Sequence, residues 1–96
     1  MDVFFIDTQR GRVATHRQLG EAGLLDEVER PPPPWHPIRG PNDASTLWYA
    51  VMRKRTHGIF IGTLCIRHTG RQASLEREGW EEVPLPEIGV DGGATR

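Results

Sequence analysis

The sequence predicts a small α+β domain built on an antiparallel β-sheet, and three observations support this class. Segment 47–68 contains two runs of strand-forming residues joined by a Thr-His-Gly turn. Two Thr-x-x-Gln sequences, beginning at Thr15 and Thr69, have the spacing of helix capping boxes. The 11 glycines and 8 prolines among 96 residues predict short elements separated by many turns.

The first half begins with a predicted hairpin. Residues 3–6 are an apolar run of strand formers, and residues 12–14 can pair back across the turn that follows them. The first capping box starts a short helix over about 16–22, and Gly23 suits the position after its C-terminal cap. Residues 24–29 are assigned to a further strand.

Residues 30–41 are predicted to form a proline-rich connector, because four consecutive prolines exclude helix and interior strand. We expect Trp35 to fold back onto the domain, where its large apolar surface can be covered.

The central hairpin is predicted to have a three-residue loop, Thr56-His57-Gly58, which pairs Arg55 with Ile59. Side chains alternate between the two faces of a strand. One face, assigned to the core, then holds Trp48, Ala50, Met52, Lys54, Phe60, Gly62, Leu64 and Ile66. The other face holds Tyr49, Val51, Arg53, Arg55, Ile59, Ile61, Thr63, Cys65 and Arg67. This assignment depends on the turn, because a slip of one residue exchanges the faces.

The second capping box predicts a helix over about 70–78. The strand expected after it must lie at an edge of the sheet, because a proline such as Pro84 is tolerated only in an edge strand. We expect a single compact domain over residues 1–85 and a flexible tail over 86–96. The two halves repeat the order of capping box, glycine and acidic strand, which is compatible with two ββαβ units or with coincidence.

Charge is distributed unevenly along the chain. Segment 47–71 contains five basic residues and no acidic residue, although the whole chain has a formal charge of −1. This segment is therefore the best candidate for a binding surface. The residues assigned to binding are Trp35, Tyr49, Arg53, Arg55, His57, Arg67 and Arg71.

Several site classes find no support in the sequence. Cys65 is the only cysteine, and its C-x-x-H spacing with His68 would place the two side chains on opposite faces of a strand. No nucleophile elbow, phosphate loop or dinucleotide motif occurs, so we expect no catalytic residues, no metal site and no cofactor. The absence of a signal-peptide pattern, a membrane-spanning run and a disulfide pair predicts a cytoplasmic protein with no membrane partner.

The leading functional hypothesis is a small non-enzymatic accessory protein of a bacterium or phage. It would bind a macromolecular partner, most simply a protein with an acidic surface, through the basic hairpin. Nucleic acid is the alternative partner, since Tyr49 shares its predicted face with three arginines. A small enzyme without a recognisable motif is a further alternative, and a homodimer is an open possibility for a domain this small.

Two short stretches resemble known domains. Tyr49-Ala50-Val51 with Arg53, Arg55 and Gly58-Ile59-Phe60 resembles the opening of the hybrid-binding domain of eukaryotic-type ribonuclease H. Lys54 stands where that family has glycine, and its downstream Trp-x-x-Cys helix is missing, so the family is not assigned. Residues 75–83 resemble the helix–Gly–Trp–Glu–x–Val ending of several small bacterial domains, which implies a fold and no activity.

Overall fold

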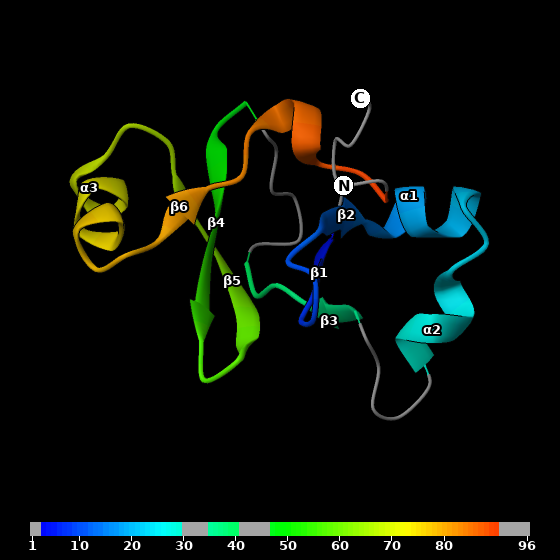
Figure 1. Ribbon diagram of the computed structural model, residues 1–96. Helices are drawn as coiled ribbons and strands as arrows, with labels where there is room; N and C mark the ends of the chain where they lie inside the picture. The colour runs from blue at the N-terminus through cyan, green and yellow to red at the C-terminus, as the bar shows by residue number, and fades with distance from the viewer. Residues whose placement is uncertain (1–2, 30–34, 41–46, 91–96) are drawn as a thin grey trace.

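The computed structural model describes residues 3–29, 35–40 and 47–90, which form two three-stranded antiparallel sheets flanked by helices (Figure 1). The first sheet has the order β2-β1-β3, with strands β1 Phe4–Asp7, β2 Val13–Thr15 and β3 Trp35–Pro37. The second has the order β5-β4-β6, with strands β4 Tyr49–Thr56, β5 Ile59–Ile66 and β6 Glu81–Glu82. The helices are α1 His16–Glu21, α2 Leu25–Glu29, α3 Gly70–Arg77 and the 3-10 helix η1 Leu85–Glu87. The predicted α+β class is confirmed.

Both halves of the chain have the same topology. In each half the first strand is central, the second pairs with it as a hairpin, and the third pairs with its other edge after a helix. All four pairings are antiparallel. Two ββαβ-like units are therefore present, and α1 and α3 occupy equivalent places in them. The third strand of the first unit is β3, however, and not segment 24–29, where the repeated sequence pattern placed it.

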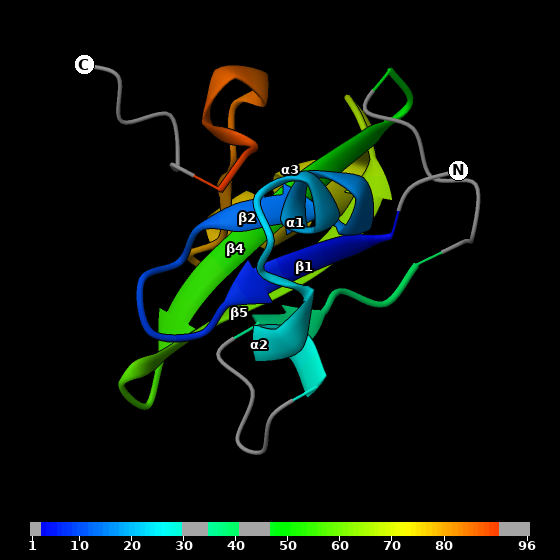
Figure 2. The ribbon, with the colours of Figure 1, turned by 90° about the vertical axis from the view of Figure 1, so that its right-hand side faces the viewer.

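The two sheets pack face to face, with helices on the outer sides (Figures 1 and 2). Alternation along the strands sends every second side chain into the layer between the sheets. The buried residues of this central layer are Phe4, Ile6, Val13, Ile38, Val51 and Val83. The layer under α1 and α2 contains Phe5, Ala14, Leu19 and Trp35, and the layer under α3 contains Ala50, Met52, Cys65 and Leu75.

Capping explains where the two main helices begin. The Thr15 hydroxyl accepts a hydrogen bond from the Gln18 amide at 3.1 Å, and the Gln18 side chain accepts one from the Thr15 amide at 2.9 Å. Thr69 caps α3 in the same way, but the Gln72 side chain instead accepts from the amide of His68. Gly23, with φ +74°, follows the C-terminal cap of α1 as predicted.

The predicted hairpin is confirmed, but its predicted register is wrong by one residue. The turn contains only His57 and Gly58, whose φ angles are +52° and +82°, so that Thr56 pairs with Ile59 and Arg55 with Phe60. Positive φ at both central positions is characteristic of a type I′ turn, whose twist matches that of the strands. As a result, each face of β4 is combined with the face of β5 opposite to the predicted one. Phe60, for example, lies on the same face as Arg55 and not on the same face as Met52.

One further expectation is corrected. Residues 25–29 form helix α2 rather than a strand, because the apolar side chains of Leu25 and Val28 have helical spacing and both pack against the buried layer that contains Phe5 and Trp35. The predicted connector contributes β3 as an edge strand. The expected tail is packed over residues 86–90, where the Gly89 amide donates to the Val13 carbonyl at 2.8 Å. Residues 91–96 lie outside the described part of the chain.

Candidate interaction surface

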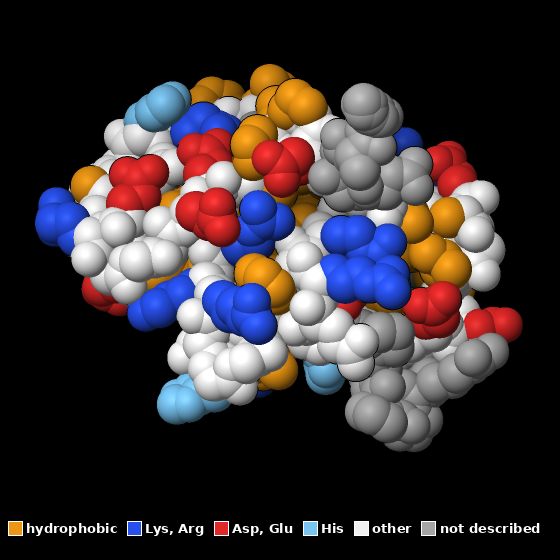
Figure 3. Space-filling view, in the orientation of Figure 1, with side chains coloured by type: hydrophobic (Ala, Val, Ile, Leu, Met, Phe, Trp, Pro, Cys, Tyr) orange, Lys and Arg blue, Asp and Glu red, His pale blue; other side chains and the backbone are white. Residues whose placement is uncertain are grey.

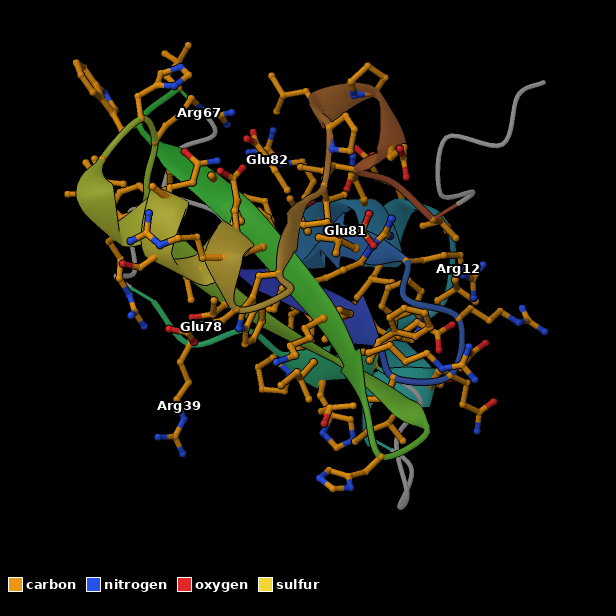
Figure 4. All side chains as sticks on the ribbon, turned by 60° about the vertical axis from the view of Figure 1, so that its left-hand side comes forward. Arg12, Arg39, Arg67, Glu78, Glu81 and Glu82 are labelled. Carbon is orange, nitrogen blue, oxygen red and sulfur yellow. The ribbon has the colours of Figure 1, made fainter. Side chains whose placement is uncertain are left out.

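Two of the arginines predicted to bind a partner are held by the protein's own carboxylates. Arg53 donates to the Gly11 carbonyl at 2.7 Å and lies 3.3 Å from a Glu81 carboxylate oxygen. Arg67 pairs with Glu82 and donates to the Tyr49 carbonyl at 2.9 Å. Figure 4 shows Arg67 and Glu82 close together, and Figure 3 shows acidic and basic side chains interspersed on one face of the molecule. Their main effect is therefore to join elements of the fold.

The other predicted binding residues are dispersed over the molecule. Trp35 has no solvent exposure and forms part of the core under α1, so it contributes nothing to the surface. Tyr49 is half-buried, whereas Arg55 and His57 are exposed at the hairpin tip. Arg71 is exposed at the start of α3, at the opposite end of the hairpin. The predicted set therefore does not form one cluster.

Trp48, expected in the core, is 70% exposed, and the neighbouring Leu47 is 80% exposed. Both precede β4, which begins at Tyr49. The opposite sheet and α3 cover side chains only within the regular strand. The predicted alternation of buried and exposed side chains therefore does not extend to Leu47 and Trp48.

The feature that the sequence did not reveal is the outer edge of β5, which we call the open edge. Among the described strands β5 pairs with β4 only, and β6 occupies the other edge of β4. The two-residue turn makes Thr56 and Ile59 a hydrogen-bonded pair, and the Arg67 amide continues this pattern by donating to the Trp48 carbonyl at 2.8 Å. Consequently, the even-numbered amides of β5 point away from β4.

One of these outward amides has a partner. The Phe60 amide donates to the Thr8 carbonyl at 2.8 Å, which confirms the outward direction. In the part of the chain that the structure describes, the next three outward amides, those of Gly62, Leu64 and Ile66, have no hydrogen-bond partner. β5 also contains no charged residue and no proline, which are the usual protections of an exposed edge.

A groove lies between the open edge and β3, the exposed edge strand of the first sheet. Its volume is about 270 Å³. It is lined by Ile6, Thr8, His36, Pro37, Ile59, Phe60, Ile61 and Gly62. The lining is mostly apolar and contains no acidic residue.

Cationic side chains stand at both ends of the open edge. At the hairpin end, the Arg55 guanidinium lies 5.6 Å from the centre of the Phe60 ring. At the other end, the backbone of Gly40 packs so closely on Leu64 that an added Cβ would lie 2.2 Å from the leucine Cδ1. The preceding residue, Arg39, is exposed and extends away from the fold in Figure 4. Among the described residues, no ion pair joins Arg39 or Arg55 to a carboxylate.

Cys65 has the environment of a buried structural thiol. Its side chain packs with Met52 and Leu75, and this burial, reinforced by the charge of Glu82, raises the pKa of the thiol. It lines neither the groove nor two further cavities, of about 450 and 250 Å³. A raised pKa lowers the thiolate fraction, which is the opposite of what a nucleophile needs.

Over residues 3–29, 35–40 and 47–90, no group of three or more His, Cys, Asp and Glu side chains is placed to hold a metal ion. No helix within these ranges is long and apolar enough to cross a membrane. Comparison of the chain with protein-family models, curated proteins and solved structures gives no match.

Proposed function

We propose that this protein is a non-enzymatic protein-binding module that takes up an extended segment of its partner along the open edge of β5. The observation that carries this proposal is the row of three outward amides, on an uncharged edge strand, that have no partner among the described residues. An added strand supplies carbonyl groups at the spacing of these amides, which is how edge strands recognise extended peptides. A protein backbone therefore satisfies the edge better than any ligand without regular acceptors.

Nucleic acid is less well suited to this surface. A phosphate backbone is bound by several unpaired cations, and binding weakens steeply with salt. Arg53 and Arg67, which were expected to supply such contacts, are paired with carboxylates of β6. The observations therefore favour a protein partner.

The test uses peptides selected from a random display library on the immobilised full chain. Their affinities are measured by fluorescence anisotropy for the native protein and for Ile66→Pro and Ile66→Ala. Both variants remove the exposed Ile66 side chain, but only proline removes the outward amide. The hydrogen bonds between β4 and β5 remain in both variants, because the amide of residue 66 points away from β4.

We expect Ile66→Pro to weaken binding about tenfold or more, and Ile66→Ala to retain most of it. Amide hydrogen exchange provides a second readout, in which the amides of Gly62 and Leu64 become protected in the complex. Equal binding by the two variants, without this protection, would refute strand addition at β5. Binding of a single-stranded oligonucleotide that falls steeply with salt would instead support a nucleic-acid partner.

A further inference from the structure

We infer that the segment taken up by the open edge is acidic and carries apolar side chains at alternate positions. This inference rests on the proposed function and specifies the chemistry of the partner. It follows from the groove that lies beside the open edge and from the arginines that stand at the two ends of the edge.

The groove accounts for the apolar positions. Alternate side chains of a strand added to β5 would point towards the sandwich, where the groove between β3 and β5 lies. Ile6, Pro37, Phe60 and the backbone of Gly62 provide an apolar lining for such a side chain. At about 270 Å³ the groove is smaller than a typical small-molecule pocket. It therefore suits a single large side chain better than a free ligand.

The charges account for the acidic character. Arg55 stands at the Phe60 end of the edge and Arg39 at the Leu64 end, and neither has a carboxylate partner among the described residues. His36 lines the groove between them. Carboxylates at the two ends of a bound segment would meet these arginines, whereas basic residues there would be repelled.

The same charges argue against a second copy of this chain as the occupant. Two β5 strands that pair antiparallel about a twofold axis bring the Leu64 end of one strand to the Phe60 end of the other. Arg39 of each copy would then face Arg55 of the other. Like charges brought together in this way disfavour association.

The probe is a capped heptapeptide of alternating glutamate and leucine, with two comparison peptides. One has lysine in place of each glutamate, and the other has a central proline that prevents strand pairing. Binding to the full chain is measured by anisotropy at low and moderate salt. The chain variants are Arg39→Glu and Arg55→Glu, with Arg17→Glu as a control of equal charge change on α1, which covers the outer face of the first sheet.

We expect the glutamate peptide to bind at least about tenfold more tightly than the lysine peptide. Each variant at the edge should reduce this preference about threefold to tenfold, and Arg17→Glu should leave it unchanged. The proline peptide should not bind. Added salt should narrow the preference, because the arginines are exposed.

Failure of this inference can be distinguished from failure of the proposed function. If the lysine peptide binds as tightly and also protects the Gly62 and Leu64 amides, the acidic preference is refuted while strand addition stands. If neither peptide protects these amides, both proposals fail. A dimer of the free protein that Ile66→Pro abolishes in sedimentation analysis would overturn the inference in favour of a second copy.

Discussion

Replacing Asp7 by asparagine should destabilise the protein strongly at neutral pH and much less in acid. Asp7 organises the β1–β2 turn, where its carboxylate accepts from the amides of Gln9 at 2.9 Å and Arg10 at 3.1 Å. Its second oxygen lies 2.8 Å from an Arg12 guanidinium nitrogen. The Asp7 side chain is only 4% exposed, so solvent screens this pair weakly.

The magnitude follows from what asparagine keeps and what it loses. The amide oxygen can still accept from the turn, but the partly buried Arg12 loses its charged partner. Breaking such a pair on one side costs about 3 kcal/mol. A domain of this size has a stability of only about 5 kcal/mol or slightly more, and its melting temperature falls by about 12–24 °C for that loss.

The pH dependence has a definite sign. Burial by itself would raise the pKa of Asp7, but the hydrogen bonds from Arg12 and from the amides of Gln9 and Arg10 outweigh it, so the pKa is lowered from 3.8. The ionised carboxylate therefore contributes stability that is fully present above the pKa in the unfolded chain. This contribution is lost as the pH falls through the lower pKa of the folded protein.

Urea unfolding, followed by tryptophan fluorescence between pH 7 and pH 3, measures this contribution. The difference in free energy of unfolding between the native protein and Asp7→Asn should be largest at pH 7 and should shrink below about pH 4. Glu76→Gln, an exposed change on α3, serves as the control and should remain within about 0.5 kcal/mol throughout. A difference between Asp7→Asn and the native protein that stays constant down to pH 3 would refute the assigned role of the ion pair.

Four other substitutions test the fold, each measured by thermal or urea unfolding. Gly11→Ala should lower the free energy of unfolding by about 2 kcal/mol, because Gly11 has φ +77° and an added Cβ would lie 2.9 Å from the Phe60 ring. An unchanged midpoint of unfolding would contradict this contact. Trp35→Ala should lower the free energy of unfolding by about 3–5 kcal/mol, because Trp35 is buried. Trp48→Ala should change it by less than about 0.5 kcal/mol, because Trp48 is exposed. Similar effects of the two substitutions would refute this difference in burial. Thr15→Ala should cost about 1 kcal/mol through loss of the capping box, and no loss would show that α1 does not depend on its cap.

Helix starts and the hairpin were predictable because local chemistry determines them. The capping threonines, the glycine after α1 and the strand-forming runs each act within a few residues. The register of the hairpin was harder, because both faces of β4 are covered. Val51 packs between the sheets while Ala50 and Met52 pack under α3, so burial on one face could not select the pairing. Only the turn distinguishes the two registers, and it places His57 in the left-handed region, which non-glycine residues seldom adopt.

The candidate site was only partly predictable for a related reason. Which cations are free depends on contacts between distant segments, as when Arg53 meets the carbonyl of Gly11. The open edge depends on which side of β4 receives β6, and a sequence pattern does not specify that order. The uncharged run from Ile59 to Ile66 was the one available signal, and it acquires meaning only once β5 is known to lie at an edge.

The repeated ββαβ topology has a consequence for how the domain unfolds. Taken alone, either unit would expose to water the side chains that now fill the layer between the sheets, including Phe4 and Ile6 from one half and Val51 from the other. Each unit is thus the folding partner of the other, as subunits are in an obligate dimer. Because a single chain carries both, their docking is intramolecular and does not depend on protein concentration. We therefore expect both halves to melt in one concerted transition at the same temperature, whatever the dilution.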